Sequence, residues 1–386
     1  MPDLATARTL LASLVGFPSV SRDSNLDLIE WVRAWLEGHR IAATVVPSPD
    51  GRKASLYAQV GPEVPGGVVL SGHTDVVPVD GQAWTSDPFT VVERDGRLYG
   101  RGTCDMKGFD ALALAALVLA KRRGVKRPLQ LALSHDEELG CVACIPMIEA
   151  MAALPRASAV IVGEPTMMKV VTGHKGGMAY WLRVKGYEVH SSIMHEGVSA
   201  ILEAAKLLAW VNAQNAANRA AKPGPLAALF NPPWTTVHTG QIAGGTAHNI
   251  TAGSCEFGID FRVVPGEDPD TWQRAFHAKV AEVEAEMKAV RPEAGIAVDE
   301  RFVVPPLAPE THGAAEALAR ALTGDNARHV VSYGTEAGQF QARGWSAVVC
   351  GPGDIAQAHQ ADEYLTVAQF NAGWAFMEDL VEGLCR

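Results

Sequence analysis

Residues 68–75 read Val-Val-Leu-Ser-Gly-His-Thr-Asp, an apolar run that stops at a glycine and is followed by a histidine and a carboxylate. The run Val68-Val69-Leu70 has the length and composition of a buried strand, so we expect His73 and Asp75 in the loop that follows it. A single histidine after a strand is more often a core or surface residue than a metal ligand, because metal sites need a cluster of ligands. The interpretation of His73 as a metal ligand is strengthened because the same pattern recurs along the chain.

Three further segments of the chain repeat this pattern. Apolar runs lead to His135-Asp136-Glu137-Glu138, to Gly163-Glu164-Pro165 and to Ala358-His359-Gln360. In open α/β sheets, ligands bind outside the carboxyl ends of the strands. We therefore expect a group of side chains to converge on one edge of a sheet, namely His73, Glu137, Glu138, Glu164 and His359.

Asp105 precedes the long apolar helix that the sequence predicts near residues 106–122. A carboxylate at this position is explained equally well as a helix cap, because it faces the positive end of the helix dipole. The neighbouring loops favour a second role as a metal ligand. The adjacent pair Glu137 and Glu138 likewise has an alternative as a solvated acidic helix start.

Bulk composition excludes several classes of protein. The chain has 386 residues, 48% of them hydrophobic and 20% charged, which fits a globular enzyme of two domains. The net charge of -10 and the lack of a basic run argue against a nucleic-acid partner. No apolar stretch is long enough to span a membrane, and the N-terminus does not resemble a signal peptide, so we expect a cytoplasmic protein.

The six cysteines are too few in a chain of this length to form a disulfide framework. Cys141 and Cys144 form a single Cys-x-x-Cys pair, without the second pair that a structural zinc site needs. We interpret the pair as core packing in preference to redox chemistry.

The order of predicted elements indicates an α/β domain with an insertion. Strands and helices alternate up to residue 176, including a helix near 141–153. Residues 177–303 then read as β-α-β-β-α-β, the ferredoxin-like module, with one of its strands over 235–242. The α/β pattern returns in residues 304–386. The sequence therefore predicts a catalytic domain in two segments, 1–176 and 304–386.

The chemistry of the cluster points to a pair of metal ions. Imidazoles and carboxylates without thiolates suit Zn²⁺, Co²⁺ or Mn²⁺. Five ligands are too many for one tetrahedral catalytic ion, but they suit two ions that share a bridging carboxylate. Asp105 is the expected bridge. We expect His73 with Glu164 at one ion, and Glu138 with His359 at the other.

Glu137 and Glu138 cannot both point at one ion, because the side chains of adjacent residues diverge. We assign Glu138 as the ligand and Glu137 as the general base that takes a proton from a metal-bound water. Asp75 is expected to accept the imidazole N–H of His73 and so fix its tautomer. No Gly-x-Ser-x-Gly elbow and no phosphate-binding loop occur, which disfavours a serine hydrolase or a nucleotide-dependent enzyme.

Five segments in chain order carry a family resemblance. They are Gly72-His73-Thr74-Asp75-Val76-Val77-Pro78, Gly102-Thr103-Cys104-Asp105-Met106-Lys107-Gly108, His135-Asp136-Glu137-Glu138, Gly163-Glu164-Pro165-Thr166 and Ala358-His359-Gln360. Together they resemble the motif set of the co-catalytic zinc amidohydrolases, which include aminoacylases, carboxypeptidase G and succinyl-diaminopimelate desuccinylase. The resemblance covers nearly the whole chain. It implies a zinc-exopeptidase-like catalytic domain that holds two Zn²⁺, with Co²⁺ as a substitute.

The resemblance also implies roles for the inserted domain. In this family it mediates homodimerisation and closes over the site. His190 matches a histidine that reaches the partner's site and stabilises the oxyanion; by sequence alone it is an ordinary loop histidine. Asn249 matches a substrate contact. Arg262 matches an arginine that binds a substrate carboxylate, with a salt bridge to Asp260 as the alternative.

The segments around Gly334-Thr335-Glu336 and Gly351-Pro352-Gly353 resemble most closely those members that act on N-acetyl-L-ornithine. Ala361 departs from them, since they usually carry proline there. The resemblance makes Thr335 and Glu336 substrate contacts and implies release of acetate from an N-acyl amino acid. Another N-acyl amino acid, such as N-succinyl-diaminopimelate, or a dipeptide is the alternative substrate. A non-catalytic metal-binding protein on the same fold is a further alternative.

Overall fold

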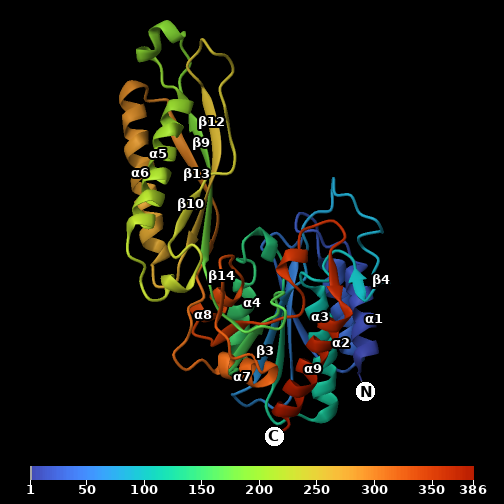
Figure 1. Cartoon of the computed structure of the whole chain (residues 1–386). Coiled ribbons are helices and arrows are strands. Elements are labelled where there is room, and N and C mark those ends of the chain that lie inside the picture. The colour runs from blue at the N-terminus through green and yellow to red at the C-terminus, as the bar shows by residue number, and fades with distance from the viewer. Residues whose placement is uncertain (1) are drawn as a thin grey trace. The chain divides into compact units, whose positions relative to one another are not determined.

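The computed structural model describes residues 2–386. The chain divides into two compact units, each with its own hydrophobic core. The first unit comprises the residues up to Gly173, Pro309–Val330 and Thr335–Arg386, and the second comprises His174–Ala308 and Val331–Gly334. Figure 1 shows how the chain leaves the first unit, builds the second and returns. The second unit is thus an insertion, as the order of motifs predicted. The later segment Val331–Gly334 also belongs to the second unit, which no sequence pattern indicated.

An eight-stranded sheet forms the centre of the first unit. Its strands lie in the order β1 (Ala43–Pro47), β2 (Ala54–Val60), β6 (Leu129–Ser134), β3 (Val68–His73), β7 (Ala159–Val162), β15 (Ala347–Val349), β8 (Val171–His174) and β14 (His329–Val331). The four strands β6, β3, β7 and β15 run parallel to one another. Every residue of β3 and β6 is buried, as expected for parallel strands covered on both faces.

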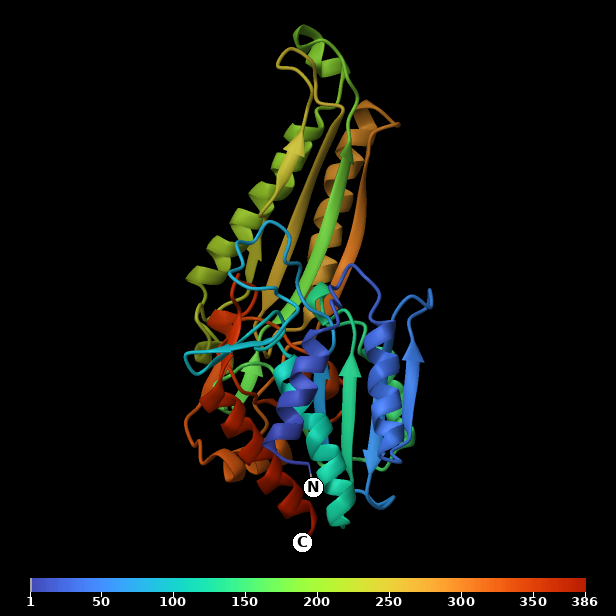
Figure 2. The ribbon, with the colours of Figure 1, turned by 90° about the vertical axis from the view of Figure 1, so that its right-hand side faces the viewer.

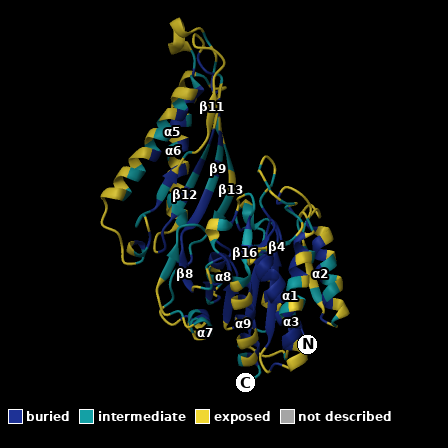
Figure 3. Ribbon diagram, turned by 45° about the vertical axis from the view of Figure 1, so that its right-hand side comes forward, coloured by how far each residue is buried: buried dark blue, intermediate teal, exposed yellow. Residues whose placement is uncertain are grey.

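Helices of the first unit pack on this sheet and on one another. They are α1 (Leu4–Val15), α2 (Leu26–Gly38), α3 (Lys107–Arg123), α4 (Ile145–Ala150), α7 (Ala314–Thr323), α8 (Ala337–Ala342) and α9 (Val367–Leu384). Helix α3 contacts β3 and β6 and also packs against α1 and α9. It is buried on all sides from Lys107 to Ala120, which explains why its sequence is apolar all round. Figure 3 shows this core as a block of buried residues.

The second unit is a sheet backed by two long helices, as Figure 2 shows. Its elements are β9 (Gly176–Lys185), α5 (Ala200–Ala220), β10 (Thr236–His238), β11 (Ile242–Gly244), β12 (Ser254–Val263), α6 (Pro269–Val290) and β13 (Gly295–Val304). The strands lie in the order β10-β12-β9-β13, with β11 also paired to β12. This is the ferredoxin-like module that the sequence predicted. Alternate residues of β12 face the core, as its period of two indicated.

Several local predictions were wrong. The single strand expected over 235–242 consists of two short strands, β10 and β11, which pair with different parts of β12. The helix expected over 141–153 begins only at Ile145, because Cys141 has a left-handed backbone (φ 54°) that no helix accommodates. Helix α1 and strand β1 were not predicted. A third small sheet, in the order β16 (Tyr364–Thr366), β5 (Arg97–Tyr99), β4 (Val92–Arg94), was also missed.

Short 3-10 helices complete the fold. They are η1 (Glu137–Leu139), η2 (Met151–Ala153), η3 (Ser191–Glu196), η4 (Ala227–Leu229) and η5 (Ile355–Gln357). Within residues 2–386, no helix combines the length and the apolar character that crossing a membrane requires.

Candidate metal centre

The carboxyl ends of the parallel strands deliver the candidate ligands to one edge of the first unit. Strand β3 ends at His73 itself, and β6 ends at Ser134, just before η1 and its two glutamates. Glu164 follows the end of β7, and His359 lies beyond the end of β15. Because these strands are parallel, their carboxyl ends meet at the same edge, as the sequence predicted.

Asp105 lies at the centre of the cluster. Its Oδ1 is 3.0 Å from His73 Nε2, and its Oδ2 is 3.3 Å from His359 Nε2. Each carboxylate oxygen therefore faces a different imidazole. His359 Nε2 is also 3.1 Å from Glu138, and His73 Nε2 is 3.7 Å from Glu164 Oε1. The expected pairs, His73 with Glu164 and His359 with Glu138, thus lie on opposite oxygens of Asp105.

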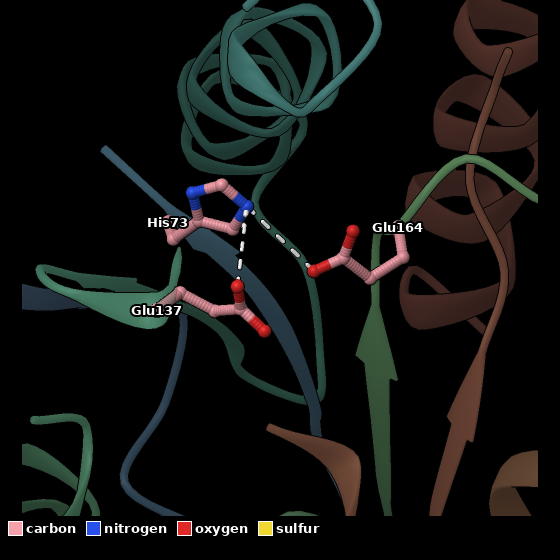
Figure 4. A group of neighbouring side chains, drawn as sticks. All are labelled: His73, Glu137 and Glu164. Atoms are coloured by element: carbon pink, nitrogen blue, oxygen red, sulfur yellow. Dashed lines mark ion pairs between the residues drawn. The ribbon is translucent and has the colours of Figure 1, made fainter. Parts of the chain in front are cut away.

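The residues present fit divalent cations. Glu164 Oε1 is buried and accepts no hydrogen bond, which is costly for a carboxylate unless a cation binds it. Two overlapping groups of three residues bring their ligand atoms within 4.8 Å of one another: His73, Glu137 and Glu164, and His73, Asp105 and Glu138. Figure 4 shows the first group, with Glu137 and Glu164 both pointing at the His73 ring. Imidazoles and carboxylates in this arrangement suit zinc and similar ions.

The electrostatics of the cluster reflect its excess of negative charge. Burial raises the pKa of Glu164 well above its usual value, and the nearby Asp105 adds to this effect. Burial opposes a charge on His73, but hydrogen bonds to Asp105 and Asp75 raise the pKa of its imidazole well above the usual value. The protein alone thus compensates the crowded carboxylates by holding protons. A bound cation would replace those protons, since metal ligands must be deprotonated.

Glu137 lies beside His73 and Glu164 and has a further contact of its own with Cys141. Burial raises the pKa of Glu137 to about 8, and only 11% of its side chain is exposed. Its Oε1 accepts a hydrogen bond from the Cys141 thiol at 2.8 Å, and its Oε2 lies 4.0 Å from His73 Nε2. A carboxylate with a raised pKa beside a metal cluster is the arrangement of a general base.

The main chain of Asp75 makes the shorter contact with His73, and its side chain lies beside the same ring nitrogen. His73 Nδ1 lies 2.9 Å from the main-chain carbonyl oxygen of Asp75, while the carboxylate is farther away at 3.6 Å. The Asp75 carboxylate also accepts the backbone N–H groups of Glu137 (3.1 Å) and Glu138 (3.3 Å). Asp75 therefore fixes the imidazole through its backbone and the two glutamates through its side chain.

The sequence did not indicate the residues that support Asp75 and the segment leading to η1. The Ser21 hydroxyl donates to Asp75 Oδ2 at 2.7 Å. The Lys53 ammonium donates to the Ser21 carbonyl and lies 2.5 Å from Asp136 Oδ1, next to Glu137. Ser21 and Lys53 lie in unrelated loops and carry no motif, so only the fold identifies them.

Thr335 and Glu336 belong to the first unit and are buried in this structure, with 1% of each residue exposed. The Thr335 hydroxyl accepts the N–H of Ala337, and Glu336 Oε2 accepts the Ser71 hydroxyl at 3.4 Å. Burial raises the pKa of Glu336 to about 7. Thr335 thus contacts the start of helix α8, and Glu336 contacts Ser71, two residues before His73 in β3.

The other predicted site residues lie in the second unit. His190 and Asn249 are exposed and adjacent, since the N–H of Ser191 donates to the carbonyl oxygen of Asn249. His190 Nδ1 is 2.7 Å from the Ser192 hydroxyl. Arg262 Nε donates to Asp260 Oδ2 at 3.0 Å, the salt bridge that the sequence offered as the alternative.

Residues 69–383 match the model of peptidase family M20/M25/M40. The acetylornithine deacetylase of Myxococcus xanthus is 36% identical over 94% of this chain and 93% of its own length. The acetylornithine deacetylase of Proteus mirabilis is 33% identical, over 99% and 97%.

The chain therefore belongs to peptidase family M20/M25/M40, and it is a metal-dependent amide hydrolase. Solved structures agree in fold. An M20 family metallo-carboxypeptidase from Sulfolobus solfataricus superimposes with a TM-score of 0.79 at 17% identity, over 97% of this chain and 98% of that one. A dinuclear metal-binding M20 peptidase from Bacillus subtilis does so with a TM-score of 0.63 at 17% identity, over 99% and 98%.

Proposed function

We propose that this protein is an acetylornithine deacetylase, which hydrolyses N-acetyl-L-ornithine to L-ornithine and acetate in the cytoplasmic synthesis of arginine. The observation that carries the proposal is the placement of two imidazoles on opposite oxygens of Asp105 in a chain of this family. The choice of substrate is supported by the two relatives, which align with this protein over nearly their full lengths.

The proposed metal ligands follow the geometry around Asp105. His73 with Glu164 would hold one ion, Glu138 with His359 would hold the other, and Asp105 would be available to both. Two Zn²⁺, or Co²⁺ in their place, would supply Lewis acidity and lower the pKa of a water molecule at this edge. Everything else in the reaction falls to the protein's own side chains.

Glu137 is the proposed general base. Its Oε2 faces the cluster while Oε1 is held by Cys141, so one oxygen is left to accept the proton of the attacking water. The water oxygen bonds to the acetyl carbon, and the C–N bond then breaks. Glu137 then gives the proton that it took from water to the departing α-amino nitrogen, and its carboxylate is restored.

Three residues of the second unit are proposed to act on the substrate, with His190 serving the site of the partner subunit. His190 would donate to the oxyanion that forms as water attacks, an interaction that gains strength only as charge develops. Asn249 and Arg262 would contact the substrate, with the guanidinium on its carboxylate. Thr335 and Glu336 are buried beside the sheet, and we propose that they support the site from behind.

Exposed apolar side chains of the second unit support a homodimer. Five large hydrophobic residues near η3, α5 and β11 are between 41% and 52% exposed: Ile193, Met194, Ile201, Leu202 and Ile242. An exposed apolar set of this kind is typical of an interaction surface. Leu202→Asp should convert the dimer to a monomer, as measured by light scattering coupled to size-exclusion chromatography. A wild-type protein that is monomeric at micromolar concentration would contradict the dimer.

The experiment that tests the proposed function is acetate release from N-acetyl-L-ornithine. Protein reconstituted with Zn²⁺ should release acetate rapidly, and a chelator-stripped sample should not. Reconstituted protein with two ions per chain and no acetate release would refute this substrate. Comparison of kcat/KM for N-succinyl-diaminopimelate, other acylamino acids and dipeptides would then identify the acyl group.

A further inference from the structure

Cys141 makes two contacts with the proposed base. Its backbone N–H donates to the carbonyl oxygen of Glu137 at 2.9 Å, and its Sγ lies 2.8 Å from Glu137 Oε1. Cys141 is 5% exposed, so the thiol has no alternative partner in bulk water. The chain turns through η1, so that the Cys141 thiol lies against the Glu137 carboxylate.

The thiol is the donor in this contact. Burial raises the pKa of Cys141 well above its usual value, with the charge of Glu137 adding to the effect, so the sulfur keeps its proton. A hydrogen bond to a carboxylate is stronger than one between neutral groups. It occupies Oε1 and leaves Oε2 on the side of His73. The contact therefore determines which carboxylate oxygen of Glu137 faces the metal centre.

The backbone conformation that brings the thiol into place is unfavourable for a cysteine. Cys141 has φ 54°, in the left-handed region that favours glycine, and it follows Gly140 with φ 123°. A non-glycine residue held in this region carries strain that the surrounding contacts must offset, and such residues concentrate at functional sites. A glycine at position 141 would relieve the strain but would remove the thiol.

We propose that Cys141 is a positioning residue for catalysis, whose thiol orients the Glu137 carboxylate so that Oε2 accepts the proton of the attacking water. The proposal rests on the proposed role of Glu137 as general base. It gives the Cys141-x-x-Cys144 pair a function beyond core packing, without disulfide chemistry. The effect is on the geometry of proton transfer and not on metal binding or substrate binding.

Cys144 provides a matched control. It is fully buried three residues farther along, and its Sγ donates to the backbone carbonyl of Cys141 at 3.3 Å. Within residues 2–386 its thiol donates no hydrogen bond to Glu137, although it also lies within hydrogen-bond reach of Glu336. Loss of Cys144 therefore changes packing in the same segment without removing the hydrogen bond to the base.

The test compares Cys141→Ala, Cys141→Ser and Cys144→Ala in the zinc-loaded full chain. We expect Cys141→Ala to lower kcat about ten-fold, the effect of losing one hydrogen bond to a charged group. KM for N-acetyl-L-ornithine and the metal content should not change. Cys141→Ser keeps a donor and should recover most of kcat, and Cys144→Ala should stay within about two-fold of the wild type.

The outcomes separate a positioning role from a structural one. Wild-type kcat in Cys141→Ala, or an equal loss in Cys141→Ala and Cys144→Ala, would overturn the proposal. If the alanine variant does not fold, Cys141→Gly suits the left-handed backbone and also removes the thiol, so its kcat decides. Failure of the proposed function would appear differently, as a wild-type protein that releases no acetate or a Glu137→Gln variant with full turnover.

Discussion

The two units of this protein hold their predicted functional residues in opposite ways. In the first unit, imidazoles and carboxylates are mostly buried and lie within 4 Å of one another around Asp105. In the second unit, His190 and Asn249 are exposed, and Arg262 is paired with Asp260. The residues of the first unit form a cluster that could bind metal ions by itself. His190, Asn249 and Arg262 form no comparable cluster in the described part of the second unit.

The difference follows from how each set is positioned. Strand ends of a parallel sheet converge without further help, so the first unit brings its ligands together as it folds. Residues on an exposed loop or strand acquire a role only when substrate or another chain approaches. Loss of a proposed ligand in the first unit should therefore affect metal binding and chemistry, and loss of a proposed contact in the second should affect chemistry or affinity alone.

Asp105→Ala should produce the largest effect. Removing the carboxylate between His73 and His359 removes a ligand from both proposed ions and takes away the contact that the two imidazoles share. We expect a loss of kcat/KM on the order of a thousand-fold, about 4 kcal/mol of transition-state stabilisation. Metal analysis should show fewer than two ions per chain. A variant with two tightly bound ions and near-normal turnover would show that Asp105 is only a helix cap.

His190→Ala should lower kcat by on the order of a hundred-fold, as loss of an oxyanion donor does in other hydrolases, and should leave the metal content unchanged. His195→Ala is the matched control, because His195 lies in the same segment and its side chain is 74% exposed. Equal, small effects of the two substitutions would assign His190 to the surface and would remove the second unit from catalysis.

The sequence predicted the parts of the fold that periodicity and motif order determine. The apolar runs before His73, Glu137 and Glu164 are consecutive parallel strands of one sheet, so their ligands had to meet. The order of strand and helix patterns over residues 177–303 indicated the ferredoxin-like insertion. These features depend on local sequence, and for that reason they could be recognised without a structure.

Contacts between distant loops could not be predicted in this way. The Asp75 carboxylate binds the amides of Glu137 and Glu138, an arrangement that depends on how two loops meet. Lys53 reaches Asp136 across 83 residues of sequence. A single strand was predicted where β10 and β11 lie, because the sequence composition does not reveal where the pairing with β12 is interrupted.

Glu336→Gln should change how stability depends on pH in the metal-free protein. Burial raises the pKa of Glu336 from 4.5 to about 7, so the folded state retains a proton that the unfolded chain releases. This contribution is fully present below about pH 4.5 and is lost as the pH rises through 7, a difference of about 3 kcal/mol at most. Urea unfolding from pH 4.5 to 7.5 should show a shallower decline in the variant. Identical slopes would contradict the burial of an ionisable Glu336.

Arg262→Gln should have the smallest effect. A guanidinium that binds the substrate carboxylate contributes affinity, so we expect KM for N-acetyl-L-ornithine to rise about ten-fold with kcat nearly unchanged. The salt bridge to Asp260 is partly exposed and should contribute little to stability. Unchanged KM, with a small loss of thermal stability, would leave Arg262 with its structural role only.

The most direct test of the account is a metal titration of Glu137→Gln beside the wild type, because Glu137 lies close enough to His73 and Glu164 to be a ligand itself. Metal-free protein is titrated with Co²⁺, and bound ions and acetate release are measured in the same samples. The account predicts two ions per chain in both proteins and a loss of turnover of at least about a hundred-fold in the variant. Loss of one ion in Glu137→Gln, or two ions with full turnover, would contradict it.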